Sequence, residues 1–418
     1  MHYSKFADRL TADGGILSLM KDLGTCLTSN SMIMMGGGNP GHVPEIEALV
    51  ADRLLQIAED PVQVRQVAGL YDPPQGNKQF RGLLADLLRQ EYGWDITADN
   101  ICLTCGSQGS FFLLFNMLAG RFADGRRKKI LLPLAPEYIG YADIGLCDDF
   151  FAAYLPEVEL LDGRFFKYRI NFAELEIGQD IGAICVSRPT NPTGNVLTDR
   201  EMERLMELAA AHRVPLIVDN AYGVPFPGII FTRATPVWNE DLVLCMSLSK
   251  FGLPGARTGI VVASREIASR LAAANAVLNL APGSLGPMLA CNLVESGEIL
   301  RLADQVIRPF YHHRLTRALE AITALFSDIP YRVHLPEGAM FLWLWFDGLP
   351  VSSGTLYARL KQRGVLVVAG HYFFPGLQQE WSHRHQCIRI TYSQDEDHVH
   401  QGLAIIADEV RKIYREGG

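Results

Sequence analysis

A lysine at the end of an apolar segment is the clearest candidate for a chemically reactive residue in this chain. Lys250 ends the run Cys245-Met-Ser-Leu-Ser-Lys250. A primary amine can form a Schiff base with an aldehyde and, once a substrate amine displaces it, can move the α-proton of that substrate. Loss of this proton leaves a carbanion, which is tolerable only if its electrons can spread into a cationic aromatic ring. The residue therefore predicts an aromatic aldehyde cofactor, pyridoxal phosphate.

An acid and two hydrogen-bond donors suited to the same cofactor lie in other segments. Asp219 follows Val214-Pro-Leu-Ile-Val218, which reads as a buried parallel strand, and ligands of open α/β sheets bind at such strand ends. Its carboxylate can hold the ring nitrogen protonated through a charge-assisted hydrogen bond that contributes about 1.5 to 3 kcal/mol. Tyr222 and Asn191 can donate to the phenolic oxygen of the cofactor. We expect Lys250, Asp219 and Tyr222 to be catalytic.

The order of four motifs resembles the fold-type I aminotransferases of the aspartate aminotransferase class. Asn-Pro-Thr-Gly, Asp-x-x-Tyr, Ser-x-x-Lys and Pro-Gly-x-Arg occupy positions 191–194, 219–222, 247–250 and 254–257. Each motif alone is common in turns and strand ends, but their joint order is specific. The likeness extends from Gly36 to the final helix. It implies an aminotransferase that binds pyridoxal phosphate.

The resemblance also assigns residues to the cofactor phosphate. Gly106-Ser107-Gln108 follows the apolar run at 101–105 and opens a helical stretch, and amides at a helix N-terminus bind phosphate. Ser107 and Gln108 match the small polar pair that holds this phosphate in the family, with Ser247 and Arg257 beside them. A guanidinium suits the role because its fork binds two oxygens at once.

Two tyrosines are assigned by the same resemblance. Tyr138, in Ala135-Pro136-Glu137-Tyr138, matches the aromatic residue that stacks on the cofactor ring. Tyr71 resembles the tyrosine that reaches the phosphate of the neighbouring subunit. The implied assembly is a homodimer with shared active sites.

Substrate binding is expected at two further places. Arg389 matches the arginine that clamps the substrate α-carboxylate. Asn191 is also expected to bind the substrate. Gly38, in Gly36-Gly-Gly-Asn-Pro40, belongs to a loop resembling the one that closes over the substrate. Members that use acidic amino acids supply a second arginine after the lysine, whereas this chain has no arginine between Arg270 and Arg301. An apolar donor such as valine or alanine is therefore expected, with pyruvate and related 2-oxo acids as partners.

Other activities stay open at this point. The same site can serve an aminotransferase for other neutral or aromatic amino acids, or a carbon-sulfur lyase, because the side-chain pocket is not identified. Fold-type I transcriptional regulators carry a DNA-binding head, and no such segment precedes Gly36. Cys102 and Cys105 form a single Cys-x-x-Cys without a second pair, so no metal is expected there. His383 and His385 are expected in a surface loop.

Composition places the chain among globular proteins of two or three domains. It has 418 residues, a net charge of -8 and 48% hydrophobic residues, which argues against nucleic-acid and anionic-membrane partners. The first ten residues lack the apolar core of a signal peptide, so a cytoplasmic location is expected. Asparagine, glycine and proline interrupt the uncharged stretch 271–294, which predicts a buried helix and loop.

The alternation of apolar runs and helical stretches predicts the fold. Runs at 101–105, 130–135, 181–187, 214–219, 242–247 and 259–263 indicate a mostly parallel α/β sheet with helices on both faces. The clearest helix spans 199–212, where Thr198 and Glu201 can form a capping box. Later strands indicate a smaller α+β domain. We predict a large cofactor-binding domain at 46–300 and a small domain at 301–418, which residues 1–45 join.

Overall fold

The computed structural model describes residues 2–12, 14–29 and 32–417. Its central sheet has eight strands in the order β2-β11-β10-β9-β8-β4-β3, with β5 also on β4. Neighbours from β10 to β5 pair in parallel, while β11 is antiparallel to both of its neighbours. The predicted, mostly parallel sheet is confirmed. The strands are β2 (Ile101–Cys105), β3 (Gly120–Arg121), β4 (Arg127–Leu132), β5 (Phe151–Ala153), β8 (Ile181–Ser187), β9 (Leu216–Asp219), β10 (Leu242–Ser247) and β11 (Thr258–Val262).

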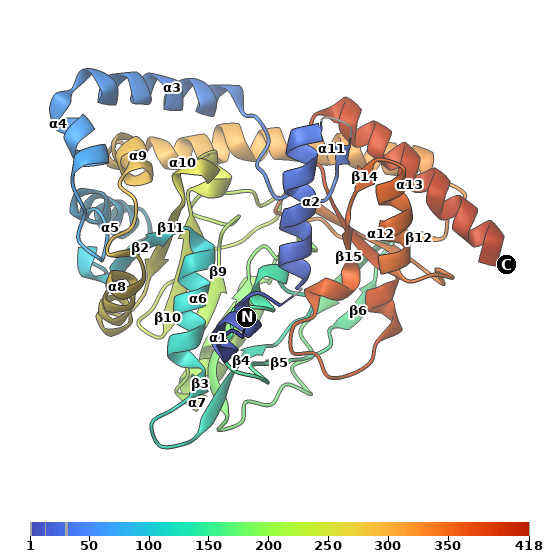
Figure 1. The fold of residues 1–418 in the computed structure, drawn as a ribbon, viewed down its shortest axis with the longest axis horizontal. Helices are drawn as coiled ribbons and strands as arrows, with labels where there is room; N and C mark the ends of the chain where they lie inside the picture. The colour runs from blue at the N-terminus through green and yellow to red at the C-terminus, as the bar shows by residue number, and fades with distance from the viewer. Residues whose placement is uncertain (1, 13, 30–31, 418) are drawn as a thin grey trace.

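Helices cover both faces of this sheet. Neighbouring strand residues point to opposite sides, and apolar residues on both sides are buried under helices. Ile130 and Leu132 pack with α6 and α8, whereas Leu131 between them belongs to the core under α5, α7 and α9. Figure 1 shows this layering. The capping box of α7 is present as predicted, with Thr198 and Glu201 exchanging hydrogen bonds. The helices are α3 (Pro44–Glu59), α4 (Pro61–Val64), α5 (Lys78–Tyr92), α6 (Ser107–Leu118), α7 (Asp199–His212), α8 (Arg265–Asn279), α9 (Leu285–Glu295) and α10 (Glu298–Leu302).

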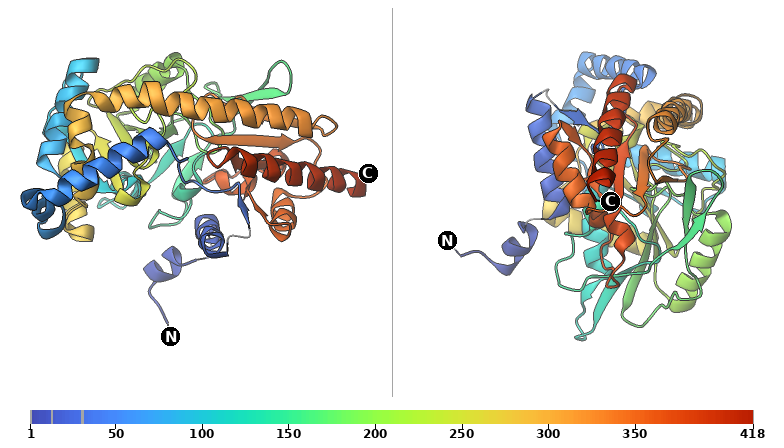
Figure 2. Two further views of the ribbon diagram at one scale, coloured as in Figure 1. Left: turned by 90° about the horizontal axis from the view of Figure 1, so that it is seen from above. Right: turned by 90° about the vertical axis from the view of Figure 1, so that its right-hand side faces the viewer.

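A second sheet has the order β15-β16-β13-β12-β7-β6 and forms the core of a smaller α+β unit. The helix α11 (Arg308–Leu325) runs from the first sheet to the second, as the two views of Figure 2 show. The remaining strands are β6 (Glu157–Leu160), β7 (Phe165–Arg169), β12 (Tyr331–His334), β13 (Phe341–Phe346), β14 (Val365–Leu366), β15 (Val368–Ala369) and β16 (Cys387–Thr391), and the helices are α12 (Ser353–Gln362) and α13 (Glu396–Gly417).

Two segments join this second unit from far away in the sequence. The strand β1 (Ile33–Met34) pairs with β14, and β7 pairs with β12 across the sheet. The hairpin β6–β7 therefore extends the second sheet although it lies within residues 46–300. The domain boundaries proposed from the sequence stay a prediction, and residues 1, 13, 30 and 31 of the N-terminal segment lie outside the described residues.

Two short helices precede β1. The helices α1 (Lys5–Leu10) and α2 (Gly15–Ser29) lie where the two units meet. Arg9 donates to the carbonyls of Gly145 and Cys147 in the first unit. Asp22 accepts hydrogen bonds from Tyr357 and Lys361 of α12. The segment of α1 and α2 thus contacts both units, α1 through Arg9 and α2 through Asp22.

Three smaller expectations can be compared with the fold. The stretch 271–294 contains the end of α8, a loop and most of α9, so the predicted helix and loop are present, but the end of α8 is exposed rather than buried, with Val277 85% exposed. No helix among the described residues is long and apolar enough to span a membrane. The surface position predicted for His383 is wrong: its side chain is buried, and its ring contacts the Tyr168 hydroxyl at 2.6 Å. The rings of Phe166, Tyr168, Trp345 and Trp381 surround it, in contacts that the sequence spacing does not reveal.

Candidate active site

A cavity of about 180 Å³ lies at the carboxyl ends of the central parallel strands. It brings together residues from both units and from the N-terminal segment, separated by up to 373 positions between Ile16 and Arg389. Among its lining residues are thirteen that the sequence singled out or that belong to the quoted motifs: Gly38, Ser107, Gln108, Tyr138, Asn191, Asp219, Ala221, Tyr222, Ser247, Ser249, Lys250, Arg257 and Arg389.

Lys250 lies in a short 3-10 turn directly after β10. Its Nζ donates to the carbonyl oxygen of Gly38 at 2.5 Å and lies 5.5 Å from the ring centre of Tyr222. Burial, together with the positive charges of Arg389 and Arg257, lowers its pKa to about 8, while the charge of Asp219 opposes this fall. A lysine with a depressed pKa is neutral more often, and only the neutral amine can act as nucleophile or base.

Asp219 ends β9, the neighbour of β10. Because the two strands pair in parallel with Asp219 opposite Cys245, the carboxylate and Lys250 meet at one edge of the sheet. Asp219 accepts hydrogen bonds from the Tyr141 hydroxyl at 2.6 Å and from the Ala221 amide at 3.0 Å. Burial raises its pKa, whereas these two bonds and the charge of Lys250 oppose that rise. The donors favour an ionised carboxylate at the floor of the cavity.

Tyr141 was missed by the sequence reasoning. It follows Tyr138 by three residues, at the end of a 3-10 turn, and its buried ring contacts the Tyr138 ring, with centroids 5.4 Å apart and planes at 90°. The occurrence of two tyrosines three positions apart, at 138 and 141, is the sequence signal that could have identified it. Tyr138 itself lines the cavity, and its stacking on the cofactor ring stays a prediction.

The residues predicted to bind the cofactor phosphate lie around the N-terminus of α6. Gly106 precedes this helix with φ of +81°, and a Cβ there would clash with Arg257 Nη2. Glycine therefore lets the Arg257 guanidinium approach the backbone next to Ser107. Ser247 Oγ accepts a hydrogen bond from the Ser249 amide at 3.0 Å. Amides of a helix N-terminus, hydroxyls and a guanidinium together form a site for a phosphate group.

Gln108 and Asn191 hold polar positions in the walls. Gln108 Nε2 donates to the Gly140 carbonyl at 2.9 Å, while its buried Oε1 has no hydrogen-bond partner within the described residues. Asn191 accepts from Arg389 Nη1 at 2.7 Å, which leaves its amide N–H groups for another acceptor. Tyr222 is buried beside Phe341, with ring centroids 5.8 Å apart.

Arg389 is almost completely buried, with 2% of its surface exposed. Nη1 donates to Asn191, and Nη2 donates to the Gly36 carbonyl at 2.7 Å. Its guanidinium carbon lies 4.1 Å from the ring centre of Phe341. Nε is buried without a hydrogen-bond partner in the described parts of the chain. Because a buried guanidinium with unused N–H groups is costly, the residue is prepared for an anionic ligand.

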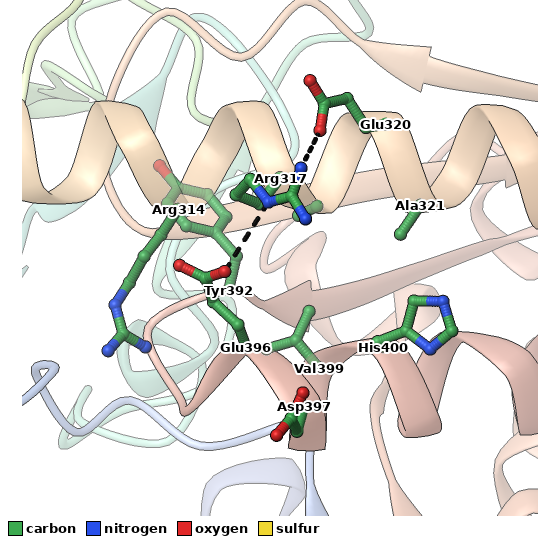
Figure 3. A pocket seen from close by; sticks show the side chains of 10 residues that line it. Arg314, Arg317, Glu320, Ala321, Tyr392, Glu396, Asp397, Val399 and His400 are labelled. Atoms are coloured by element: carbon green, nitrogen blue, oxygen red, sulfur yellow. Dashed lines mark hydrogen bonds and ion pairs between the residues drawn. The ribbon is translucent and has the colours of Figure 1, made fainter.

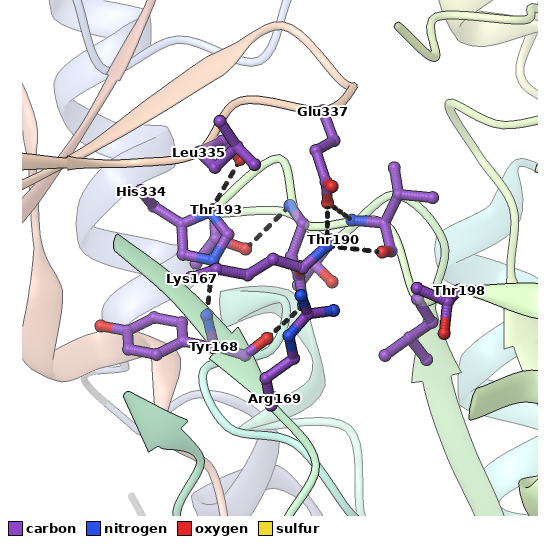
Figure 4. Close-up of polar contacts among 12 residues, drawn as sticks. Lys167, Tyr168, Arg169, Thr190, Thr193, Thr198, His334, Leu335 and Glu337 are labelled. Carbon is purple, nitrogen blue, oxygen red and sulfur yellow. Dashed lines mark hydrogen bonds and ion pairs between the residues drawn. The ribbon is translucent and has the colours of Figure 1, made fainter. Parts of the chain in front are cut away.

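The Asn191 loop is held from outside the cavity by the polar contacts in Figure 4. The buried Lys167 forms an ion pair with Glu337 at 2.5 Å, and both contact Val196: Lys167 donates to its carbonyl at 3.2 Å, and Glu337 accepts from its amide at 3.0 Å. The second sheet thereby fixes the loop that carries Asn191.

Apolar residues of α2 form the remaining wall, which sequence reasoning also missed. Ile16, Leu19 and Met20 line the cavity. Their spacing of i, i+3 and i+4 places them on one face of the helix. None carries a charge, and no acidic side chain other than Asp219 lines the cavity among the described residues.

Tyr71 is not brought into this cavity. Its side chain is 82% exposed, on the loop between the helices α4 and α5. Its predicted contact with a neighbouring subunit stays a prediction.

A second cavity, between α11 and the start of α13, differs in its chemistry (Figure 3). Arg317 pairs with Glu320 at 2.5 Å and lies 3.6 Å from Glu396, and Arg314 donates to the Ser393 carbonyl at 3.2 Å. Its guanidinium groups are thus occupied by protein acceptors. No group of three potential metal ligands occurs within the described residues, which includes the surroundings of Cys102 and Cys105.

The residues around the first cavity fit pyridoxal phosphate. The Nε of Arg389 and the Oε1 of Gln108 are buried without a partner among the described residues, and the buried carboxylate of Asp219 and the amides at the N-terminus of α6 add further polar groups at the cavity. They match an acidic substrate group, a cationic ring and a phosphate, with Lys250 between them.

The chain is similar to known aminotransferases both in sequence and in structure. Residues 47–406 match the family described as aminotransferase class I and II. The chain is 49% identical over 416 residues to valine-pyruvate aminotransferase from Escherichia coli, with both chains fully covered. It is 24% identical to aspartate/prephenate aminotransferase from Thermus thermophilus over 80% of this chain and 81% of that one. The crystal structure of valine-pyruvate aminotransferase from Salmonella typhimurium matches with a TM-score of 0.89 and 48% identity, covering 96% of this chain and 100% of that one.

Proposed function

The chain belongs to the class I and II aminotransferases, and from this premise we propose that it transfers the amino group of L-valine to pyruvate. The products are 3-methyl-2-oxobutanoate and L-alanine. The enzyme is an aminotransferase with pyridoxal phosphate as its cofactor. The specific pair of substrates is supported by the full-length likeness to valine-pyruvate aminotransferase and by the uncharged α2 face of the cavity.

The observation that carries the proposal is the convergence of Lys250, Asp219 and Arg389 on one cavity with an apolar wall. When bound, pyridoxal phosphate supplies an aldehyde for the substrate amine and a ring that accepts electrons. The protein supplies the orientation and the proton transfers, which decide the bond that breaks.

Each residue then has a proposed task. Lys250 Nζ removes the proton from the α-carbon of valine, and later returns a proton to the α-carbon of the product alanine. Asp219 keeps a proton on the ring nitrogen. Arg389 holds the α-carboxylate through its free N–H groups, so that the α-hydrogen faces Lys250. Asn191 and Tyr222 donate to the phenolic oxygen.

The remaining assignments concern binding. We propose that Ser107, Gln108, Ser247 and Arg257 hold the phosphate, while Tyr138 stacks on the ring. Gly38 borders the substrate, and its carbonyl accepts a hydrogen bond from Lys250 Nζ. Tyr71 completes the phosphate site of a second copy in a homodimer, and the enzyme works in the cytoplasm.

Substrate panels test this proposal. Valine added to the purified enzyme should convert the cofactor spectrum to that of its amine form, and pyruvate should restore the first spectrum. Alanine with 3-methyl-2-oxobutanoate should drive the reverse reaction. Faster conversion by aromatic donors would replace the proposed substrates, release of a thiol from cysteine conjugates would indicate a lyase, and binding without turnover would refute an enzyme function.

A further inference from the structure

A second buried acid lies behind the cavity and has no task in the reaction described above. Glu137 has 2% of its surface exposed and lies in the segment between β4 and Tyr138. Its Oε1 accepts from the Ser187 amide at 2.9 Å, and its Oε2 lies 2.5 Å from the Ser187 hydroxyl oxygen. Its amide donates to the Phe373 carbonyl at 2.8 Å. Glu137 therefore connects three separate segments.

The position of Ser187 relates this acid to Asp219. Ser187 ends β8 directly opposite Asp219 on β9, and it lines the cavity. The carboxyl of Glu137 thus fixes the segment that carries Tyr138 and Tyr141 to the strand next to Asp219. Tyr141 in turn donates to Asp219.

We propose that Glu137 is a positioning residue that keeps its proton, so that Asp219 carries the negative charge at the floor of the cavity while Ser187 and Tyr141 are held in place around it. This inference rests on the proposed function only in requiring a charged Asp219.

The distribution of donors supports this division of charge. Within the described residues Glu137 forms no ion pair, whereas the buried Glu409 contacts Arg359 at 2.5 Å and Arg363 at 3.0 Å. Asp219 receives the Tyr141 hydroxyl and lies near Lys250. Two buried carboxyl groups that repel each other electrostatically do not both ionise readily, and the group without a cationic partner keeps the proton.

The surrounding titratable groups agree with this arrangement. Burial, with a smaller contribution from the charge of Asp219, raises the pKa of Glu137 to about 8, although the hydrogen bonds from Ser187 and from the Tyr138 amide oppose the rise. The phenol of Tyr141 and the thiol of Cys185 also face this region, and burial raises the pKa of each, so both stay neutral. Three cationic side chains line the cavity, those of Lys250, Arg257 and Arg389.

A protonated Glu137 has a geometric consequence. Its Oε2–H can donate to the Ser187 hydroxyl oxygen, and the separation of 2.5 Å suits a short O–H···O hydrogen bond. The hydroxyl hydrogen of Ser187 is then free to point into the cavity. In an ionised Glu137 that hydrogen would be consumed by the carboxylate.

Infrared spectroscopy of the full-length enzyme with its cofactor tests the protonation directly. At pH 7 the wild-type spectrum should contain the C=O band of a protonated carboxylic acid, which shifts on labelling with ¹³C-glutamate and is missing in Glu137→Gln. The exposed Glu207→Gln variant on α7 should retain the band and serves as the control. Absence of the band in the wild type would overturn the proposal.

Kinetics test the consequence for the site. Glutamine reproduces the donor and acceptor of a protonated glutamate, so Glu137→Gln should keep kcat within about twofold at pH 7, whereas Glu137→Ala should lose roughly 10- to 100-fold through misplacement of the site. With a pKa near 8, the ratio of Glu137→Gln to wild-type activity should rise about tenfold between pH 7 and pH 9. The ratio cancels the titration of Lys250, which both proteins share. A flat ratio would also overturn the proposal, and these two measurements decide it even if Glu137→Ala does not fold.

Discussion

Replacing Arg389 by lysine should separate recognition of the substrate carboxylate from the rest of the reaction. The guanidinium has five N–H groups. One on Nη1 donates to Asn191 and one on Nη2 donates to the Gly36 carbonyl, which leaves Nε–H and two others for a ligand. Lysine retains the charge but loses the planar fork.

The expected loss follows from the number of hydrogen bonds involved. Each bond from a charged donor contributes about 1.5 to 3 kcal/mol, and a lysine replaces at most one of the two that clamp a carboxylate. The net loss of one such bond lowers kcat/KM for valine roughly 10- to 150-fold. An amine of the same shape without a carboxylate, isobutylamine, should react at nearly the same low rate with both proteins.

Stopped-flow measurement of the first half-reaction is the appropriate assay, because it separates the dissociation constant of valine from the rate of proton transfer. We expect the larger change in the dissociation constant. Arg301→Lys is a matched control, since Arg301 is half exposed and pairs with Glu298 on the surface, where ion pairs contribute little. Unchanged valine binding in Arg389→Lys, or an equal loss for isobutylamine, would refute the assigned role.

Three other perturbations have defined outcomes. Tyr141→Phe removes a bond that lowers the pKa of Asp219, so the acidic limb of the pH profile of kcat/KM should move to higher pH, and an unmoved limb would exclude this coupling. Leu19→Arg places a cation on the apolar α2 face; kcat/KM for valine should fall at least about tenfold, while aspartate should improve as a donor, and an unchanged ratio of the two donors would mean that α2 does not face the substrate. Burial lowers the pKa of His334 to about 3, below the ordinary value near 6.5. Its neutral form therefore stabilises the fold above about pH 6.5, and this contribution should be lost by up to about 1.4 kcal/mol per pH unit as the pH falls from there toward 3. Urea unfolding of His334→Gln should show a weaker pH dependence over this interval than the wild type, and equal slopes would contradict the assignment.

Much of the architecture could be predicted because it depends on local patterns. Continuous apolar runs located β2, β8, β9 and β10 to within two residues at each end. The α7 cap was evident from two residues three positions apart. Parallel pairing then places the ends of neighbouring strands at one edge of the sheet, which is why Asp219 and Lys250 could be expected to meet.

The features that were missed depend on contacts between distant segments. The β6–β7 hairpin has no local signal that distinguishes the first sheet from the second, because its partner β12 follows more than 160 positions later. The α2 face reads as an ordinary amphipathic stretch until the fold places it over the cavity. Glu137 and Tyr141 lie in an irregular turn, where neither helical nor strand periodicity indicates the direction of a side chain.

Chemical trapping of the cofactor tests the central claim, that Lys250 is the amine that reacts at this cavity. Purified enzyme loaded with pyridoxal phosphate would be reduced with borohydride, digested and mapped by mass spectrometry. We predict a phosphopyridoxyl group on Lys250, and its absence from that position in Lys250→Ala together with the loss of repeated turnover. A label on another lysine, or full turnover by Lys250→Ala, would contradict the account.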